Sequence, residues 1–325
     1  MSEPLLSVWI VTYNHEKFIA QCIESALMQK TNFEFEIVIG EDCSTDGTRT
    51  IVKEYEKKYP GIIRAIYHQE NVGAYRNAYE YTLPICKGKY IAVLEGDDYW
   101  TDPYKLQKQV DCLEDNEKLS FCFHSILIVN FGEKKNTITA RKYFKDRIFN
   151  IKDLINGDGS FVPTPSILFR KSLIGNIPDF LKSAPMGDYF LTLILGDKGD
   201  SYYIDQPMAV YRKRVTGSWS ENNNQLSDQS LSKQYKEIIL SLKRFNDFTQ
   251  FRYDNIIKNH LINIGLDLYS KKIIKSKDEL ISFGLLIKSL NIYSMRRLMI
   301  GIKDTLWHSI KKTFYKIGVY FNLSF

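Results

Sequence analysis

Short apolar stretches alternate with segments of helical periodicity in the first third of the chain, and this alternation limits the fold more than any other feature. Strand-like runs rich in β-branched residues are predicted at 5–12, 35–40, 62–67 and 90–94. Segments with apolar residues at helical spacing lie between them, at 16–27, 46–59 and 74–83. Because the connections are short, we expect an α/β fold in which helices cover both faces of a mostly parallel sheet.

Each of these predicted strands is followed by polar residues. Thr12, Tyr13 and Asn14 follow the first, Glu41 and Asp42 the second, Asn71 and Gly73 the third, and Asp97 and Asp98 the fourth. A single aspartate after a strand is more often a helix cap or a turn residue. In an open parallel sheet, however, ligands bind beyond the carboxyl ends of the strands. The recurrence of polar residues at one edge therefore predicts a shared binding crevice.

The composition is that of an ordinary folded protein. Of the 325 residues 44% are hydrophobic and 25% are charged, which excludes a disordered or collagen-like chain. The five cysteines are odd in number and have no CxxC spacing, so we expect neither a disulfide scaffold nor a zinc finger. The sequence shows no secretion signal and no apolar run of membrane-spanning length, so we expect a cytoplasmic protein.

Four segments of the front part together resemble the family 2 glycosyltransferases with the GT-A fold. They are SVWIVTYN at 7–14, EDCSTDGT at 41–48, NVG at 71–73 and EGDDYW at 95–100. Their order and spacing are highly specific, and the resemblance extends over about residues 4–220. It implies a GT-A fold, a mostly parallel sheet flanked by helices, for a catalytic domain at 1–225, followed by an α-helical region at 226–325.

The resemblance implies that the crevice binds a nucleotide-sugar donor, most often a UDP-sugar. The implied donor contacts are Thr12, Tyr13, Asn14, Glu41, Asp42, Asn71 and Gly73, with Asp42 reading the base. Asp98 would hold a divalent metal, Mn²⁺ or Mg²⁺, against the diphosphate. Asp97 would be a second metal ligand or a ribose contact. The chemistry makes the same demand, because a hard cation on carboxylate oxygens stabilises the charge of the leaving group. The alternative to a metal site is that Asp97 and Asp98 form a solvated acidic turn that caps the helix starting near Pro103.

The acceptor side is predicted within 150–220. The resemblance places the catalytic base at Asp188, beside the acceptor hydroxyl, and the alternative is a helix N-cap. Trp100 is predicted either to stack on the acceptor sugar or to anchor its loop from a buried position. Many relatives carry a histidine where this chain has Arg214. Because arginine does not ligate metals, we expect Arg212 or Arg214 to contact the diphosphate, with a plain surface arginine as the alternative.

The basic charge of the chain is concentrated at its C-terminal end. The net charge is +6, yet residues 1–230 hold 27 Lys and Arg against 31 Asp and Glu, while the remainder holds 17 against 7. The pattern from 231 onward is helical, and an apolar stripe with flanking lysines runs over 298–321. This stripe is predicted to lie on an anionic membrane surface, or else to pack on the catalytic domain or on a second subunit. We expect no nucleic-acid partner, because no recognised nucleic-acid module accompanies the charge.

These observations predict a metal-dependent inverting glycosyltransferase that transfers a sugar to a glycan or lipid-linked acceptor, in surface polysaccharide biosynthesis by the resemblance alone. A location on the inner face of the cell membrane and a homo-oligomer are compatible with this prediction. One alternative, a sugar nucleotidyltransferase, needs a glycine-rich loop after the first strand, whereas residues 12–16 read TYNHE. The other alternative is a non-catalytic protein that keeps the fold and binds glycan or membrane.

Overall fold

A computed structural model describes residues 3–131, 137–140, 143–157, 159, 161–215, 221, 227–270 and 273. The apolar stripe predicted at 298–321 lies outside the described residues. The prediction about its partner is therefore not tested by the structure, and the domain boundary near 225 also stays a prediction.

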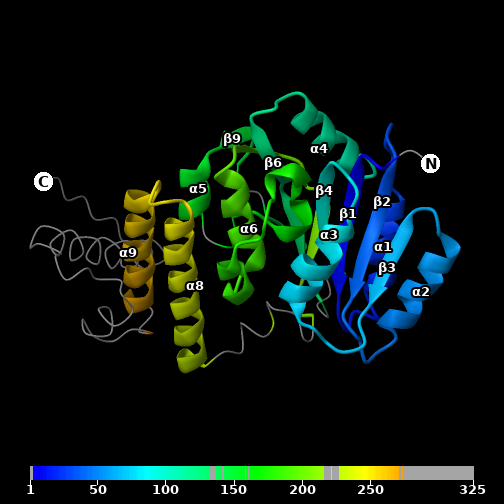
Figure 1. The fold of residues 1–325 in the computed structure, drawn as a ribbon, viewed down its shortest axis with the longest axis horizontal. Coiled ribbons are helices and arrows are strands. Elements are labelled where there is room, and N and C mark those ends of the chain that lie inside the picture. The colour runs from blue at the N-terminus through cyan, green and yellow to red at the C-terminus, as the bar shows by residue number, and fades with distance from the viewer. Residues whose placement is uncertain are drawn as a thin grey trace, which may run out of the picture.

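The centre of the molecule is an eight-stranded sheet with the strand order β3-β2-β1-β4-β10-β6-β11-β9 (Figure 1). Its first half is parallel and consists of β1 (Leu6–Thr12), β2 (Phe35–Glu41), β3 (Ile63–Tyr67) and β4 (Tyr90–Glu95). Its second half consists of β10 (Leu168–Arg170), β6 (Leu119–His124), β11 (Asp200–Ile204) and β9 (Arg147–Phe149). Strand β10 runs antiparallel to both neighbours, so the sheet is mixed. The predicted α/β class is confirmed.

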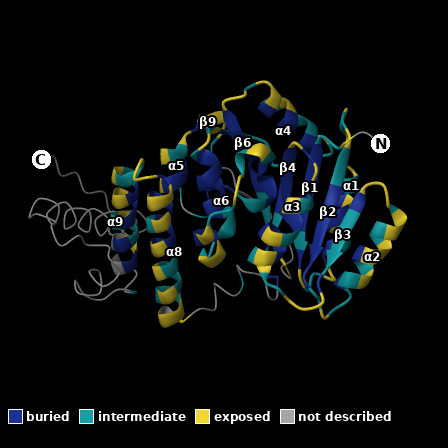
Figure 2. Ribbon diagram, in the orientation of Figure 1, coloured by how far each residue is buried: buried dark blue, intermediate teal, exposed yellow. Residues whose placement is uncertain are grey.

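Alternate side chains of β1 enter two apolar cores on opposite faces of the sheet. Val8 and Ile10 pack in the same cluster as Ile23, on the face covered by α1 (Ile19–Leu27), α2 (Thr48–Lys58) and α4 (Lys105–Glu114). Trp9 belongs to the other cluster and meets the ring of Tyr79 edge to face. Figure 2 shows the resulting arrangement of buried strands beneath helices with exposed outer faces.

The helix predicted at 74–83 has a different geometry from the one expected. It is π-helical over Arg76–Thr82 (η1) and continues as the short α3 (Leu83–Ile85). The Thr82 hydroxyl donates to the Asn77 carbonyl at 2.6 Å, and the Asn77 amide donates to the Gly40 carbonyl at 2.9 Å. Because these side chains bond to the backbone, the turn widens, which is the usual behaviour of a π-bulge.

A second sheet of four strands stands beside the acidic turn at 95–98. It contains β5 (Tyr99–Trp100), β12 (Ala209–Lys213), β7 (Ile126–Asn130) and β8 (Thr137–Ala140), in that order. The paired strands β6 and β11 both bend out of the main sheet near Ser125, whose amide donates to Ile204 and whose carbonyl accepts from Met208. The chain then continues as the parallel pair β7 and β12.

Two long helices of the C-terminal region pack on the front part of the molecule. Helices α8 (Asp228–Phe248) and α9 (Asp254–Ser270) lie next to each other beside α5 (Ile151–Asn156) and α6 (Gly187–Gly196) (Figure 1). Leu242, Phe245 and Ile257 share one apolar cluster with Phe190 of α6. Within the described ranges, no helix combines the length and the apolar character that crossing a membrane requires.

Candidate active site

The loops that follow β1 and β2 are held together by hydrogen bonds. Asn14 takes a left-handed conformation, with φ of 56°, and its side-chain oxygen accepts from the Thr45 amide at 2.8 Å. Its own amide donates to the Ser44 hydroxyl at 3.0 Å. Tyr13, on the same turn, is 41% exposed, whereas Thr12 is buried. The structure thus brings the first two predicted donor-binding segments together, with the Tyr13 ring open to solvent.

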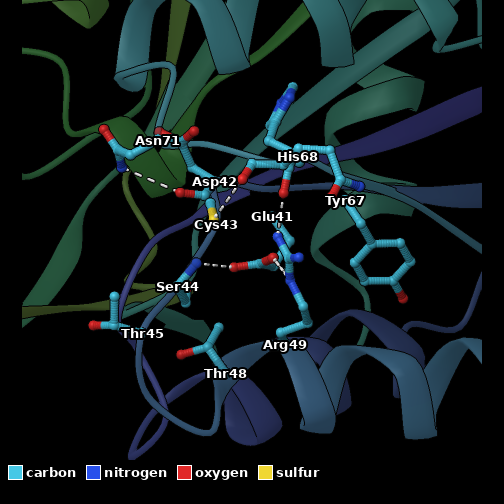
Figure 3. A network of polar contacts seen from close by, with 12 residues as sticks. Glu41, Asp42, Cys43, Ser44, Thr45, Thr48, Arg49, Tyr67, His68 and Asn71 are labelled. Atoms are coloured by element: carbon cyan, nitrogen blue, oxygen red, sulfur yellow. Dashed lines mark hydrogen bonds and ion pairs between the residues drawn. The ribbon is translucent and has the colours of Figure 1, made fainter.

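Glu41 holds the second loop from inside. Its side chain is fully buried, and one carboxylate oxygen accepts from the Ser44 amide at 2.6 Å (Figure 3). The other carboxylate oxygen pairs with Arg49, which also donates to the His68 carbonyl at 2.6 Å. Both oxygens of Glu41 therefore already have protein partners that fix the shape of the loop.

The ion pair between Arg49 and Glu41 is expected to stabilise the folded protein. Replacing Arg49 with methionine leaves the buried Glu41 carboxylate without its counter-charge, and we expect the free energy of unfolding to fall by about 3 kcal/mol. Arg76→Met is the matched control, because it breaks an exposed pair with Glu80 and is expected to cost no more than about 0.5 kcal/mol. Denaturant unfolding of both variants measures the difference. Equal losses would contradict the role given to Glu41.

Asp42 connects the loops after β2 and β3. Its carboxylate accepts from the amides of Val72 at 2.7 Å and Gly73 at 3.0 Å, and its carbonyl accepts from the Asn71 side chain at 3.1 Å. Gly73 has a φ of +85°, which favours glycine at this turn. Each carboxylate oxygen keeps a lone pair for a further donor. The structure therefore brings Asp42, Asn71 and Gly73 together, as the strand-edge argument predicts.

The turn after β4 gathers three carboxylates. Oxygens of Glu95, Asp97 and Asp98 all lie within 4.8 Å of one another, and Asp98 is fully buried. One Asp98 oxygen accepts from the Arg212 amide at 2.8 Å, while the other finds no hydrogen-bond partner among the described residues. Burial, with Asp97 and Glu95 as negative neighbours, raises the pKa of Asp98 well above its usual range. An orphaned buried carboxylate oxygen is costly, and a hard divalent cation is the partner this donor set suits.

Glu95 is the residue that the sequence analysis missed in this cluster. Burial, followed by the charges of Asp97 and Asp188, raises its pKa to about 8. Glu95 ends β4, and a carboxylate at the carboxyl end of a central strand is a signal for a site residue. The charge of Asp188, the predicted base, thus acts on the acidic turn through Glu95.

Arg212 fastens the acidic turn from β12. Its guanidinium donates to the Asp97 carbonyl and to the Gln21 side chain, and it lies 4.4 Å from the centre of the Tyr99 ring. The Arg212 guanidinium is therefore already bonded to the protein, whereas the sequence predicts a contact with the diphosphate. Arg214 is exposed, with a φ of 61°, and directly follows β12. Of the two predicted phosphate contacts, Arg214 has the more accessible side chain.

The first loop touches the acidic turn at Gly96. A Cβ atom there would lie 2.4 Å from the Thr12 hydroxyl and 2.7 Å from Nδ1 of His15, so only glycine fits without displacing these side chains. The Thr12 hydroxyl and His15 Nδ1 are themselves 3.2 Å apart. The loop expected to bind the nucleotide and the turn expected to bind the metal therefore form one surface.

Asp188 lies in the first turn of α6 and reaches back toward a separate turn. Its Oδ2 accepts from the Thr164 hydroxyl at 2.6 Å and its Oδ1 accepts from the Tyr189 amide at 2.8 Å. The N-cap of α6 is Met186, without a side-chain cap bond, so the N-cap alternative for Asp188 is wrong. Loss of solvent around the side chain raises the pKa of Asp188.

Trp100 has the geometry of the loop anchor. It is 1% exposed, and its indole nitrogen donates to the Pro165 carbonyl at 2.9 Å. Lys105 lies over its ring at 4.1 Å from the centre. Because neither the edge nor the face of the ring is open, stacking on an acceptor sugar is not compatible with this structure, and the second of the two sequence interpretations applies.

The fold and the site together define an α/β protein with a cluster of carboxylates at the carboxyl ends of its parallel strands. The family description "Glycosyl transferase family 2" matches residues 7–177, and the chain belongs to this family.

Similar proteins extend this result. The uncharacterised protein Rv1520 of Mycobacterium tuberculosis is 31% identical over 66% of this chain, and the match spans 60% of that relative's length. The dTDP-rhamnosyl transferase RfbG of Shigella flexneri is 26% identical over 70% of this chain and 78% of its own. The crystal structure of S. aureus TarS 1–349 with UDP-GlcNAc has a TM-score of 0.59 at 18% identity, covering 92% of this chain and 80% of the TarS 1–349 chain. This structural likeness confirms the GT-A-like fold.

Proposed function

We propose that the protein is a metal-dependent inverting glycosyltransferase that transfers a sugar from a nucleotide-sugar donor, a UDP-sugar, to an acceptor hydroxyl. The observation that carries the proposal is the acidic turn of three carboxylates, in which one buried Asp98 oxygen has no partner among the described residues. Asp188, whose charge acts on Glu95 of this turn, is the proposed base. An inverting reaction needs a base on one side of the anomeric carbon and a stabilised diphosphate on the other. One crevice provides both.

The donor nucleotide is proposed to lie across the joined loops after β1, β2 and β3. The open ring of Tyr13 and the remaining lone pairs of Asp42 are the groups available to the base, with Thr12 and Asn14 shaping the pocket. Asn71 and Gly73 are proposed to border the ribose and diphosphate. Glu41 acts by holding the loop in shape, and Arg214 is proposed to contact the diphosphate.

Asp98 and Asp97 are proposed to hold Mn²⁺ or Mg²⁺, with Glu95 beside them. When bound, this ion would neutralise the charge that develops on the leaving diphosphate. Asp188 accepts the proton of the acceptor hydroxyl, whose oxygen forms a bond to the anomeric carbon while the bond from that carbon to the diphosphate breaks. Its two hydrogen bonds aim the carboxylate at a fixed position, which lowers the cost of reaching the reactive geometry.

The acceptor is proposed to be a glycan or lipid-linked saccharide of a surface polysaccharide pathway. One relative whose name states such a pathway supports this, the putative teichuronic acid biosynthesis glycosyltransferase TuaG of Bacillus subtilis. The excess of Lys and Arg in residues 231–325 supports a location at the inner face of the cell membrane, because basic segments are attracted to anionic lipid.

Thermal unfolding with nucleotide sugars tests donor and metal binding together. We expect the unfolding temperature to rise with a UDP-sugar and Mn²⁺, because a ligand that binds only the folded state stabilises it, and we expect chelation to remove most of the rise. GDP-mannose and a dTDP-sugar are run in parallel. A rise with one of these instead keeps the mechanism and changes the donor, whereas no rise with any of them, from well-folded protein, would contradict the proposal.

A further inference from the structure

The turn that faces Asp188 is fixed from behind by buried side chains. Residues Thr164–Ser166 form a single 3₁₀ turn that follows Pro163 and contains Pro165. The Trp100 indole donates to the Pro165 carbonyl at 2.9 Å, and the Gln109 amide donates to the Ser166 carbonyl at 2.9 Å. Trp100 and Gln109 are themselves buried. Two adjacent carbonyls of the turn are therefore bound to β5 and α4, which leaves the turn little freedom to move.

Thr164 presents its hydroxyl from this turn to the carboxylate of Asp188. The distance of 2.6 Å to Oδ2 is that of a strong hydrogen bond between a hydroxyl and a carboxylate. The second bond, from the Tyr189 amide to Oδ1, comes from the other side of the carboxylate. Together the two donors fix the rotation of the carboxylate, and each oxygen keeps a lone pair for the acceptor hydroxyl.

The same turn is connected to the diphosphate side of the crevice. Trp100 belongs to β5, which begins at Tyr99, directly after Asp98. Strand β5 is also paired with β12, whose Arg212 binds both Asp97 and Asp98. A rigid connection therefore runs from the acidic turn through Trp100 and Pro165 to Thr164. We expect this connection to fix the position of the Asp188 carboxylate relative to the acidic turn, where the leaving diphosphate is proposed to bind.

We propose that Thr164 is a positioning residue for the reaction, which orients the Asp188 carboxylate and holds it at a fixed distance from the acidic turn. This inference rests on the proposed function, because it takes Asp188 as the base. The hydroxyl bond also favours the ionised carboxylate, since it lowers the pKa of Asp188 while burial raises it. A base must be ionised to accept a proton, so both effects of Thr164 act in the same direction.

The test compares how kcat changes when a side-chain hydroxyl is removed at Thr164 and at Ser166, two positions of the same turn. Thr164→Val keeps the side-chain volume and removes the bond to Asp188, whereas Thr164→Ser keeps the hydroxyl. Ser166→Ala removes a hydroxyl that donates to the Pro163 carbonyl, at the start of the same turn. The reaction measured is nucleoside diphosphate release with Mn²⁺ from UDP-glucose, UDP-GlcNAc, GDP-mannose and dTDP-rhamnose, with water as acceptor. We expect Thr164→Val to lower kcat roughly 10- to 100-fold with little change in the KM of the donor. Thr164→Ser and Ser166→Ala should stay within a few-fold of the parent.

Combining Thr164→Val with Asp188→Asn separates positioning from a general structural role. If Thr164 acts through Asp188, the double variant is no slower than Asp188→Asn alone, because the group it orients is already gone. A further loss of the same size in the double variant would overturn the proposal, as would parent-like kcat in Thr164→Val. Thr164→Ala replaces the valine variant if the latter does not fold.

The experiment distinguishes failure of the proposed function from failure of the inference about Thr164. In that case the parent protein releases no nucleoside diphosphate from any of the four donors, or Asp188→Asn is as active as the parent. If the parent is active, Asp188→Asn is inactive and Thr164→Val is unchanged, only the inference about Thr164 is overturned.

Discussion

Asp188→Asn is expected to reduce sugar transfer about 10³-fold while leaving donor binding close to that of the parent protein. The asparagine keeps the size of the side chain but has no basic oxygen to accept the proton of the acceptor hydroxyl, and general-base catalysis contributes effects of this order. Transfer rates and the thermal shift with the donor and Mn²⁺, measured on the same preparation, separate the two effects.

Asp179→Asn is the matched control for this variant. Asp179 lies in the 3₁₀ turn Asp179–Ser183 ahead of α6, and its exposed side chain pairs with Lys182. Its removal should leave both transfer and donor binding unchanged. If Asp188→Asn transferred sugar at the parent rate, Asp188 would not be the base and the mechanism proposed for this crevice would be wrong.

Asp98→Asn is expected to remove the dependence of donor binding on metal and to lower transfer by about 10² to 10³. The amide loses the negative charge that a divalent cation requires, and that cation stabilises the leaving diphosphate by several kcal/mol, with each 1.36 kcal/mol worth a factor of ten in rate. Thermal shift with UDP, with and without Mn²⁺, measures the binding, and nucleoside diphosphate release measures the rate.

The same variant should be at least as stable as the parent protein without ligands. Burial and two negative neighbours raise the pKa of Asp98, so keeping it ionised at neutral pH costs folding free energy, and asparagine removes that cost. Asp111→Asn, at an exposed position of α4, is the control and should change neither binding nor stability. A parent-like metal response in Asp98→Asn would exclude Asp98 as a ligand.

The parallel half of the sheet could be predicted because it depends on local patterns. The apolar runs that became β1 to β4 are short, β-branched and separated by helical segments, so their places in the chain and their parallel direction follow from the sequence. Their polar ends then had to meet at one edge, which is why Asp42 and Gly73 were expected together.

The second sheet and the orientation of the base depend on contacts between distant parts of the chain. Strand β5 has only two residues, and its partner β12 follows more than a hundred residues later, so no local pattern marks it. The bond from Thr164 to Asp188 joins two separate turns in the same way. A tryptophan such as Trp100 can stack on a sugar or pack in a core. Its buried position is explained by the hydrogen bond to the Pro165 carbonyl, which lies far away in the sequence.

The most direct test of the account is nucleoside diphosphate release by the parent protein from a panel of UDP-, GDP- and dTDP-sugars, measured with Mn²⁺ and again with a chelator. The account predicts release from at least one donor, with most of the activity lost on chelation and nearly all of it lost in Asp188→Asn. Well-folded protein that neither binds nor cleaves any donor in the panel, with or without metal, would contradict it.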